Sequence, residues 1–458
     1  MAIATINPAT GLTEAEFAPH DAAETERRIA EAAAAADALR LTDYGTRAGW
    51  MRASADILES EVDSVARMLT VEMGKPIAQS RGEVLKCAKN MRFYAERAEG
   101  FLADEPLSDP ASVGASRAWT RYEPLGVVLA VMPWNYPLWQ VIRFAAPALM
   151  AGNTGVLKHA SNVPQAALYL DTLFERGGFP TGSFRTLLIG SSAVADVIAD
   201  RRVKAVTLTG SEPAGRSVAS IASHHIKKAV LELGGSDPFI VLPSADVAKA
   251  AETAVLARTG NNGQSCIAAK RFIVHTDVYD EFTRAFGERM AALTVGDPLD
   301  EATQIGPLAT SAGREELAEL VDDALAKGAT ARVGGSQPDR PGWYYEPTVL
   351  EGITSEMRLY KEEAFGPVAT VYRVDDIEEA IALANSTTFG LSSSVWTNDP
   401  AEERRATGAL DAGAVFVNGM TASFPELPFG GIKDSGYGRE LAASGIREFC
   451  NLKTVWKA

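Results

Sequence analysis

The sequence is poor in cysteine and histidine. Among 458 residues there are three cysteines, Cys87, Cys266 and Cys450, and five histidines. Cysteines so few and so scattered exclude a disulfide framework and are typical of a protein of the reducing cytosol. His224 and His225 are neighbours, but adjacent side chains do not face the same way on an element. Because CxxC and HExxH motifs are also absent, we expect no metal site.

Long apolar runs and an excess of basic residues are missing as well. No apolar run approaches the roughly 18 residues that a membrane-spanning helix needs. The first eight residues contain neither a basic nor an apolar signal region, so we expect a cytoplasmic protein rather than a secreted one. The formal net charge of −15 disfavours general binding to nucleic acid or anionic membranes. With 46% apolar residues, the chain can fill the cores of about two or three domains.

The first half of the chain predicts helices followed by a parallel sheet. Residues 21–103 are predicted to be mainly helical, and the following stretch, 105–116, is a polar connector. Four short apolar strands then alternate with helices; they are predicted over residues 126–131, 154–158, 185–190 and 203–209. This alternation is typical of right-handed crossovers in a parallel sheet, where ligands bind at the carboxyl ends of the strands. Ser161 and Asn162 are predicted to cap the helix after the second strand.

The second half predicts another α/β region. Its strands are predicted over residues 239–242, 272–275, 331–333 and 368–374, with helices over 279–293, 314–327 and 377–385. A last strand, over 449–456, has no neighbour in sequence with which to pair. It therefore needs a partner from elsewhere in the chain or from another subunit.

A cysteine and a carboxylate are the first candidates for chemistry. Cys266 follows a short polar, glycine-containing turn, and Glu232 ends an apolar run. A thiol that attacks and a carboxylate that activates water would together support a covalent thioester mechanism. Taken alone, a cysteine such as Cys266 is more often a small packed residue than a nucleophile. The leucines beside Glu232 favour partial burial, which would raise its pKa toward that of a general base.

Polar residues at predicted strand ends are the next candidates. The segment 209–215 follows a strand and opens a helix with Pro213, as in a phosphate site, although on this motif alone an ordinary capped turn is the commoner explanation. Lys158, at the carboxyl end of a predicted strand, could donate hydrogen bonds to ribose or phosphate oxygens of a cofactor; alternatively it is an ordinary solvated lysine. The side-chain amide of Asn135 could stabilise an oxyanion; alternatively Asn135 is an asparagine required by the turn. A GxGxxG fingerprint is absent, so a standard Rossmann motif is not indicated.

Taken together, seven segments in order resemble the aldehyde dehydrogenase family along essentially the whole chain. They are Pro133-Trp134-Asn135, Leu157-Lys158, Leu208-Thr209-Gly210-Ser211, Leu231-Glu232-Leu233-Gly234-Gly235, Gly263-Gln264-Ser265-Cys266, Glu362-Glu363-Ala364-Phe365-Gly366-Pro367 and Pro428-Phe429-Gly430-Gly431. The resemblance implies an α/β fold with a Rossmann-like parallel-sheet cofactor domain over residues 1–231, interrupted near 105–122 by part of a small oligomerisation arm. It further implies an α/β catalytic domain over 232–424 and a return segment with an oligomerisation strand over 425–458, in a homodimer or homotetramer.

The resemblance also implies a reaction. Cys266 would attack an aldehyde, the Asn135 amide and the Cys266 N–H would hold the oxyanion, and Glu232 would activate water to release an acid. The implied cofactor residues are Pro133, Trp134, Lys158, Ser161, Gly210, Ser211, Glu363 and Phe365. Ser161 stands where relatives that prefer NAD often carry glutamate, so we predict that NADP is preferred and that NAD is also accepted.

The implied substrate is succinate semialdehyde. Arg143 matches an arginine that holds the distal carboxylate of the substrate in succinate-semialdehyde dehydrogenases. Ser423 lies near the position of a serine that helps this arginine to bind the carboxylate. Some members carry a second carboxylate-binding arginine, and this chain has Gly260 at that position, with Arg258 close by in sequence. Because that contact is lost, a dehydrogenase with a broader preference for small aldehydes is the alternative. A regulatory cysteine of other members is replaced by Ala268, which excludes that disulfide switch.

Two further classes compete with this prediction. A cysteine hydrolase also uses a thiol, but no histidine lies in a suitable motif near Cys266. An inactive binding protein would not need Cys266, Glu232 and Asn135 together.

Overall fold

Helices form the N-terminal part of the protein, as the sequence predicts. The computed structural model describes residues 3–458, and it places α1 (Ala22–Leu39), α2 (Tyr44–Ser60), α3 (Val62–Met73) and α4 (Ile77–Phe101) in succession after a hairpin of β1 (Ile3–Ile6) and β2 (Thr13–Phe17). The carboxylates of Asp21 and Asp43 cap α1 and α2 by accepting from backbone N–H groups at 2.8 Å. Gly74 ends α3 in the left-handed conformation, and a Cβ there would lie 2.6 Å from the Pro307 carbonyl oxygen.

A six-stranded sheet follows, in the order β17-β9-β8-β5-β6-β7. Its parallel strands are β5 (Val127–Met132), β6 (Thr154–His159), β7 (Phe184–Thr186), β8 (Val203–Thr209) and β9 (Lys228–Glu232), and β17 (Gly436–Tyr437) adds an antiparallel edge. The connecting helices are α5 (Trp139–Ala151), α6 (Pro164–Arg176), α7 (Val194–Ala199) and α8 (Glu212–His224). The four predicted strands are confirmed, β7 being shorter than expected, and β9 is an additional one.

The start of α6 corrects one prediction. Ser161 and Asn162 do not cap this helix, which begins at Pro164 after Val163. The cap comes instead from Glu72 at the end of α3, whose carboxylate accepts from the N–H groups of Gln165 at 2.8 Å and Ala166 at 3.0 Å. A cap supplied from so far away along the chain has no local signature.

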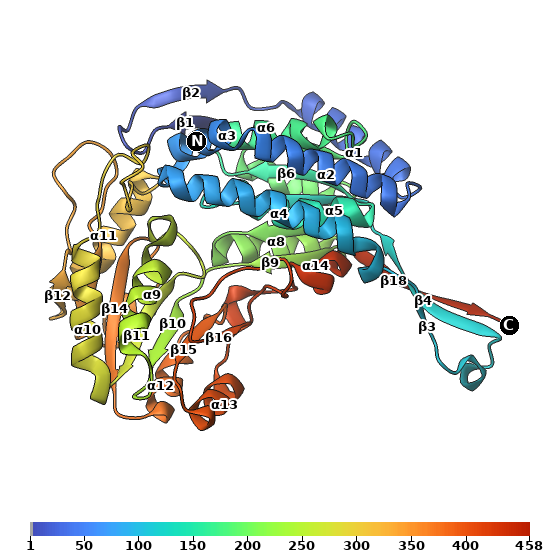
Figure 1. The fold of residues 1–458 in the computed structure, drawn as a ribbon. Helices are drawn as coiled ribbons and strands as arrows, with labels where there is room; N and C mark the ends of the chain where they lie inside the picture. The colour runs from blue at the N-terminus through green and yellow to red at the C-terminus, as the bar shows by residue number, and fades with distance from the viewer. Residues whose placement is uncertain (1–2) are drawn as a thin grey trace.

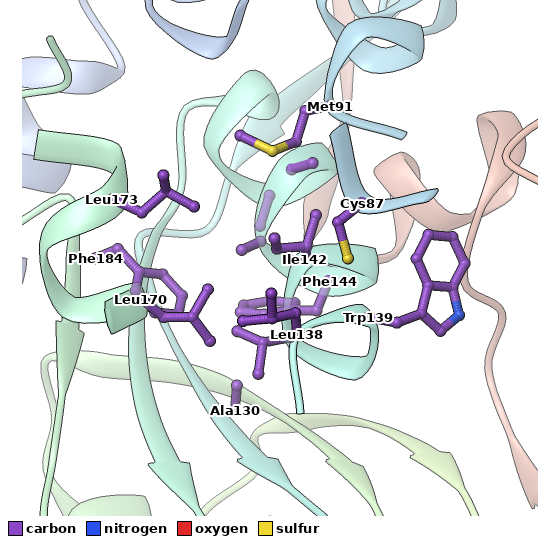
Figure 2. Close-up of a cluster of buried hydrophobic side chains, with 14 of the residues drawn as sticks. Cys87, Met91, Ala130, Leu138, Trp139, Ile142, Phe144, Leu170, Leu173 and Phe184 are labelled. Carbon is purple, nitrogen blue, oxygen red and sulfur yellow. The ribbon is translucent and has the colours of Figure 1, made fainter. Parts of the chain in front are cut away.

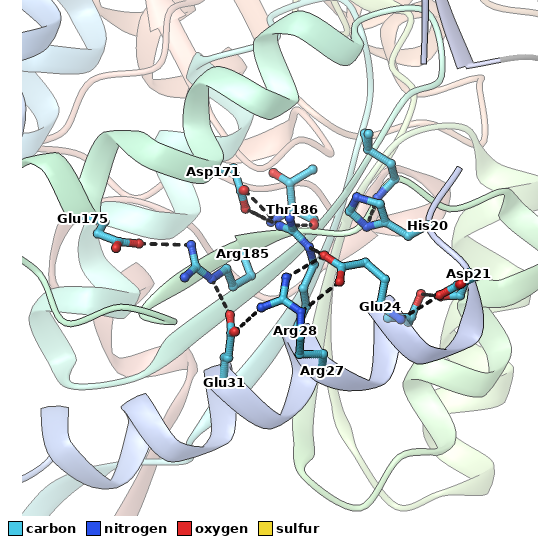
Figure 3. A network of polar contacts seen from close by, with 12 residues as sticks. His20, Asp21, Glu24, Arg27, Arg28, Glu31, Asp171, Glu175, Arg185 and Thr186 are labelled. Carbon is cyan, nitrogen blue, oxygen red and sulfur yellow. Dashed lines mark hydrogen bonds and ion pairs between the residues drawn. The ribbon is translucent and has the colours of Figure 1, made fainter. Parts of the chain in front are cut away.

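Helices cover the first sheet and bury its core. Figure 2 shows side chains from α4, α5 and α6 packed over the sheet, with Trp139 at the edge of the cluster near Cys87. At the edge of this sheet formed by β7, Arg28 holds α1 in place. It donates to the Asp171 carboxylate at 2.8 Å and to the Thr186 carbonyl at 3.0 Å (Figure 3). These contacts tie α1 to both α6 and β7.

The second sheet has seven strands in the order β12-β13-β14-β11-β10-β15-β16. They are β10 (Asp237–Val241), β11 (Ala269–His275), β12 (Thr330–Val333), β13 (Thr348–Glu351), β14 (Val368–Val374), β15 (Ser393–Trp396) and β16 (Val415–Val417). Its helices are α9 (Val247–Thr259), α10 (Thr276–Ala291), α11 (Ser311–Ala326), α12 (Ile377–Ala384) and α13 (Pro400–Ala409). All pairings are parallel except that of β12 with β13, which confirms the predicted α/β class. The domain bounds at 231 and 424 stay a prediction.

A three-stranded arm projects from the body of the molecule and carries the C-terminus (Figure 1). After α14 (Ala442–Glu448), β18 (Cys450–Lys457) pairs antiparallel with β4 (Arg117–Pro124), which also pairs with β3 (Glu105–Pro106). The last strand therefore finds its partner within the same chain, on the far side of the predicted connector. Within residues 3–458, no helix is long and apolar enough to span a bilayer.

Candidate active site

Four neighbouring strands deliver the predicted site residues to one edge of the first sheet. β9 ends at Glu232, β8 leads into Gly210 and Ser211, β5 leads into the segment 133–135, and β6 ends beside Lys158. Because these strands are parallel and adjacent, their carboxyl ends share that edge. The Gly210 N–H donates to the Glu232 carbonyl at 3.0 Å and holds two of these ends together.

The turn before Cys266 is held in an unusual backbone conformation. Asn261, Asn262 and Gly263 have φ values of 58°, 57° and 74°, in the left-handed region that asparagine and glycine tolerate best. A Cβ on Gly263 would lie 2.4 Å from the backbone of Gly366, so this position requires glycine. The Asn262 amide donates to the carbonyls of Gly74 at 2.9 Å and Pro307 at 3.0 Å. The sequence of the turn thus follows from its strained path.

Two buried cations fix the backbone on either side of the cysteine. Arg258 is fully buried and donates to the carbonyls of Gly263 at 2.5 Å and Ala269 at 3.1 Å. Its guanidinium is therefore occupied by the nucleophile loop and does not replace the arginine missing at Gly260. Lys270 donates to the carbonyls of Ser265 at 3.0 Å and Cys266 at 2.9 Å.

Asn135 and Cys266 line one cavity of about 320 Å³. The Asn135 amide nitrogen donates to the Gln264 carbonyl at 3.1 Å, and the Asn261 amide donates to the Asn135 carbonyl at 2.8 Å. These bonds position the amide directly beside the cysteine turn. Asn135 is 4% exposed, so a developing negative charge there would be shielded from water.

Glu232 is buried at the end of β9 next to a second buried carboxylate, Glu440. Among residues 3–458 neither oxygen of the Glu232 carboxyl has a hydrogen-bond partner, and a Cβ on Gly430 would lie 2.8 Å from one of them. Burial, and then the charge of Glu440, raise the pKa of Glu232 well above its ordinary value, while Arg143 opposes the shift. A carboxyl with a raised pKa suits proton transfer near neutral pH.

The Cys266 thiol is partly exposed and protonated at rest. Burial raises its pKa to about 12, against the charges of Arg143 and Lys270, which lower it. Those two cations therefore favour the thiolate, although burial outweighs them.

The cofactor side of the cavity is apolar and opens at a helix end. Trp134 and Phe365 meet edge to face, with ring centroids 5.7 Å apart. Pro133, Gly210 and Ser211 line the same cavity, and Pro213 stands in the first turn of α8. A second cavity of about 690 Å³ shares Trp134, Ser211, Gly234, Glu363 and Phe365 with the first. An aromatic wall beside a helix N-terminus fits a nicotinamide nucleotide.

Glu363 reaches this cavity from the loop before β14. Its Oε1 lies 2.9 Å from Lys270 Nζ and accepts from the Gly235 N–H at 3.3 Å. A Cβ on Gly234 would lie 2.6 Å from Oε2, so that glycine leaves room for the carboxylate. Glu363 is thus held at the wall of the cavity by Lys270 and the Gly235 N–H.

The end of β6 presents a cation. Lys158 is half-buried, its pKa is lowered by burial alone, and in the described part of the chain no carboxylate is paired with it. The neighbouring His159 ring bonds the Pro137 carbonyl at 2.9 Å, and burial lowers its pKa to about 4, so it is neutral. Ser161 follows on the same loop, where its carbonyl accepts from the Ala4 N–H at 3.1 Å. An uncompensated lysine beside a serine fits a phosphate-bearing ribose.

The two predicted substrate residues, Arg143 and Ser423, are both buried. Arg143, on α5, forms an ion pair with Glu440 and lies 4.6 Å from the centre of the Phe429 ring. Ser423 accepts from Lys86 Nζ at 2.8 Å and from Trp139 Nε1 at 3.1 Å.

Three charged residues of this region were missed by sequence reasoning: Glu440, Lys270 and Lys86. Glu440 and Lys86 come from segments with no recognisable chemical pattern, and only the fold brings them to the site. Lys270 lies two residues before the strand predicted over 272–275, and only the structure, in which β11 begins at Ala269, places it on a buried strand.

Comparisons with known proteins agree with this geometry. Residues 1–455 match the model of the aldehyde dehydrogenase family. Two relatives named succinate-semialdehyde dehydrogenase [NADP(+)] are similar throughout: one from Mycobacterium avium is 63% identical and matches 100% of this chain and 97% of its own. One from Mycobacterium tuberculosis H37Rv is 61% identical, with 100% of both chains matched.

Solved structures agree as well. A succinic semialdehyde dehydrogenase from Streptococcus pyogenes in complex with NADP+ has a TM-score of 0.96 at 36% identity, covering 99% of each chain. A succinate-semialdehyde dehydrogenase from Burkholderia pseudomallei has a TM-score of 0.96 at 35% identity, covering 99% of this chain and 94% of its own. The chain belongs to the aldehyde dehydrogenase family.

Proposed function

We propose that this protein oxidises succinate semialdehyde to succinate with NADP as the preferred cofactor. The observation that carries the proposal is the meeting of Cys266, Asn135 and Glu232 at one sheet edge, between an aromatic cofactor cavity and the cation Arg143. The names of the similar enzymes support the same substrate and cofactor.

Cys266 first loses its S–H proton to water, and the resulting thiolate attacks the aldehyde carbon through its sulfur. The carbonyl oxygen becomes an oxyanion, which the Asn135 amide and the Cys266 N–H stabilise by hydrogen bonds. Trp134 and Phe365 wall the cavity, and Glu363 bonds the ribose of the cofactor, whose nicotinamide accepts the hydride when bound. What remains on the enzyme is a thioester of Cys266.

Glu232 completes the reaction as a general base. Its buried carboxylate removes a proton from water as the water attacks the thioester carbon. The carbon–sulfur bond then breaks, the acid leaves, and Cys266 remains on the enzyme as a free thiolate. The absence of hydrogen-bond partners for its two oxygens suits this role, since either oxygen is free to accept the proton.

The cofactor preference follows from charge. A glutamate in place of Ser161 would repel a 2′-phosphate, whereas serine and Lys158 both donate to it. We therefore propose NADP as the better substrate and NAD as an accepted one.

A less selective small-aldehyde dehydrogenase is the alternative, and one observation favours it. Arg143 is already neutralised by Glu440, so its attraction for a substrate carboxylate is reduced. Steady-state rates on succinate semialdehyde, butanal and betaine aldehyde, each with NADP and NAD, separate the two functions. Equal kcat/KM on all three aldehydes would contradict the proposed substrate, and a ratio favouring NAD would contradict the proposed cofactor.

We also propose a homodimer or homotetramer that assembles through the arm, in the reducing cytoplasm. Exposed apolar side chains gather on the arm; they are Leu107 (42% exposed), Val113 (51%), Leu452 (55%) and Trp456 (52%). Apolar side chains concentrated on a projecting arm favour a protein partner. The proposed compartment rests on the sequence, whose three scattered cysteines are typical of a reducing environment. Light scattering of the intact protein and of Trp456→Ser tests the assembly.

A further inference from the structure

One face of α4 runs along the loops of the active site. Gln79, Glu83 and Lys86 are spaced by four and three residues and so lie on the same face of the helix. Gln79 accepts from the Asn261 N–H at 2.6 Å, in the turn before the nucleophile. Glu83 accepts from the N–H groups of Leu138 and Trp139, each at 2.9 Å, at the start of α5. Lys86 is the next residue along this face.

Lys86 is a half-buried cation without a counter-ion. Its Nζ donates to Ser423 Oγ at 2.8 Å and lies 4.0 Å from the centre of the Trp139 ring. Nowhere in residues 3–458 is a carboxylate paired with it. By contrast Lys89, one turn further along α4, is 65% exposed and lies 3.5 Å from the Glu426 carboxylate.

The charges around Lys86 leave this corner electropositive. Burial first, and then the charge of Arg143 on α5, lower the pKa of Lys86 to about 8; Lys75 acts in the same direction, whereas Cys87 and Glu83 oppose it. Glu83 is itself paired with Lys75. Arg143 is paired with Glu440, so the uncompensated positive charge of this corner belongs to Lys86.

The corner is near the nucleophile and also near solvent. The Lys86 ammonium group lies over the ring of Trp139, which follows Asn135 by four residues, and Asn135 lines the cavity that also contains Cys266. Leu85 and Phe424, the sequence neighbours of Lys86 and Ser423, are 49% and 43% exposed. Neither Lys86 nor Ser423 lines the cofactor cavity. The Lys86 ammonium group therefore stands outside that cavity, and no carboxylate of the described residues is paired with it.

We propose that Lys86 is a specificity-determining residue that binds the distal carboxylate of the substrate, together with Ser423, and that it supplies the cation missing at Gly260. This inference rests on the proposed function. The Ser423 hydroxyl, which accepts from both Lys86 and Trp139, remains free to donate its own proton to a carboxylate oxygen. A charge-assisted pair at a half-buried site is worth about 10- to 100-fold in binding.

Kinetics of Lys86→Met, Lys86→Arg and the control Lys89→Met on succinate semialdehyde and on butanal test the proposal. Butanal has the same chain length and no carboxylate. Lys86→Met should lower kcat/KM about 10- to 100-fold on succinate semialdehyde, mainly through KM, and less than about twofold on butanal. Lys86→Arg should restore most of the loss, and Lys89→Met should change neither rate.

The pH dependence adds a readout that a merely structural role would not give. In the wild type, the ratio of kcat/KM on succinate semialdehyde to that on butanal should fall as pH rises through about 8, where Lys86 loses its charge. In Lys86→Arg this fall should disappear. Taking the ratio cancels the titration of Cys266 and Glu232, which both substrates share.

The outcomes separate the two proposals. A wild-type ratio near one would overturn the proposed substrate and this inference with it. A high wild-type ratio that Lys86→Met leaves unchanged would overturn the role of Lys86 alone. An equal loss on both aldehydes would show that Lys86 supports the fold rather than the carboxylate, and would also overturn it.

Discussion

Lys270 joins Glu363 to the nucleophile loop. Its Nζ lies 2.9 Å from Glu363 Oε1 while it donates to the backbone carbonyls of Ser265 and Cys266. One buried ammonium group therefore positions both the residue proposed to bind ribose and the backbone that carries the thiol. Because Lys270 is 2% exposed, water cannot replace these bonds without reorganisation.

Replacing Lys270 by methionine should affect stability and cofactor binding together. The carbonyls would lose their donor and Glu363 its counter-ion, so we expect the free energy of unfolding to fall by about 2–4 kcal/mol. The KM for NADP should rise severalfold. Chemical denaturation and initial rates measure both, with the exposed Lys249→Met as control. Unchanged stability would show that the carbonyls find other donors.

Replacing Glu232 by glutamine should separate the two halves of the reaction. Thioester formation would survive, so a burst of NADPH should precede steady-state turnover slowed by about 10²- to 10⁴-fold. Mass spectrometry should detect the acylated protein, and Cys266→Ala should give neither burst nor adduct while still binding NADP. Equal slowing of burst and turnover would contradict a role confined to hydrolysis.

The hydrolytic step should also depend on pH through Glu232. Its pKa is raised by burial, and the base acts only when ionised. The steady-state rate should therefore increase as pH rises through that pKa and be lost as pH falls. In Glu232→Gln this dependence should vanish, which a pH profile of kcat measures.

Exchanging Ser161 for glutamate should reverse the cofactor preference. A carboxylate beside a 2′-phosphate is repelled but can bond a 2′-hydroxyl, so the NADP/NAD ratio of kcat/KM should fall at least about tenfold. Ser64→Glu places the same charge on an exposed site of α3 and should leave the ratio unchanged. A ratio unaffected by Ser161→Glu would place the phosphate elsewhere.

Glu72 should make stability depend on pH. Burial raises its pKa from 4.5 to about 7, so the folded protein holds this proton more tightly than the unfolded chain. The contribution of Glu72 to the free energy of unfolding is therefore complete below pH 4.5. It is lost as pH rises through about 7, a change of about 3 kcal/mol. Unfolding free energies of Glu72→Gln should lack this decline, whereas the exposed Glu252→Gln should keep it.

Periodicity predicted the regular elements well because local patterning determines them. The strands β5, β6 and β8 and the helix α12 lie within a residue or two of their predicted bounds. For β18, which pairs with β4, periodicity indicated no partner, and only the family resemblance joined the two regions in one arm. Two other non-local arrangements escaped prediction: the cap that Glu72 gives α6 and the antiparallel edge β17. Each joins segments far apart in the chain, and neither partner carries a signal of the other.

The residues of the site also fall into two groups, those that the local sequence predicts and those that only the packing of distant segments brings together. Cys266, Asn135 and Gly210 could be predicted because each follows a strand or turn with its own sequence pattern, and the family resemblance identified them. The ion pair of Arg143 with Glu440 and the contact of Lys86 with Ser423 could not, because they depend on packing between the two ends of the chain.

The place of β17 has a consequence for synthesis on the ribosome. Gly436 and Tyr437 pair with the end of β9, and Gly430 packs against the Glu232 carboxyl. These residues are translated about two hundred positions after Glu232 itself. A nascent chain can therefore form most of the first sheet early, yet the buried surroundings of its proposed base are completed only when nearly the whole polypeptide has emerged.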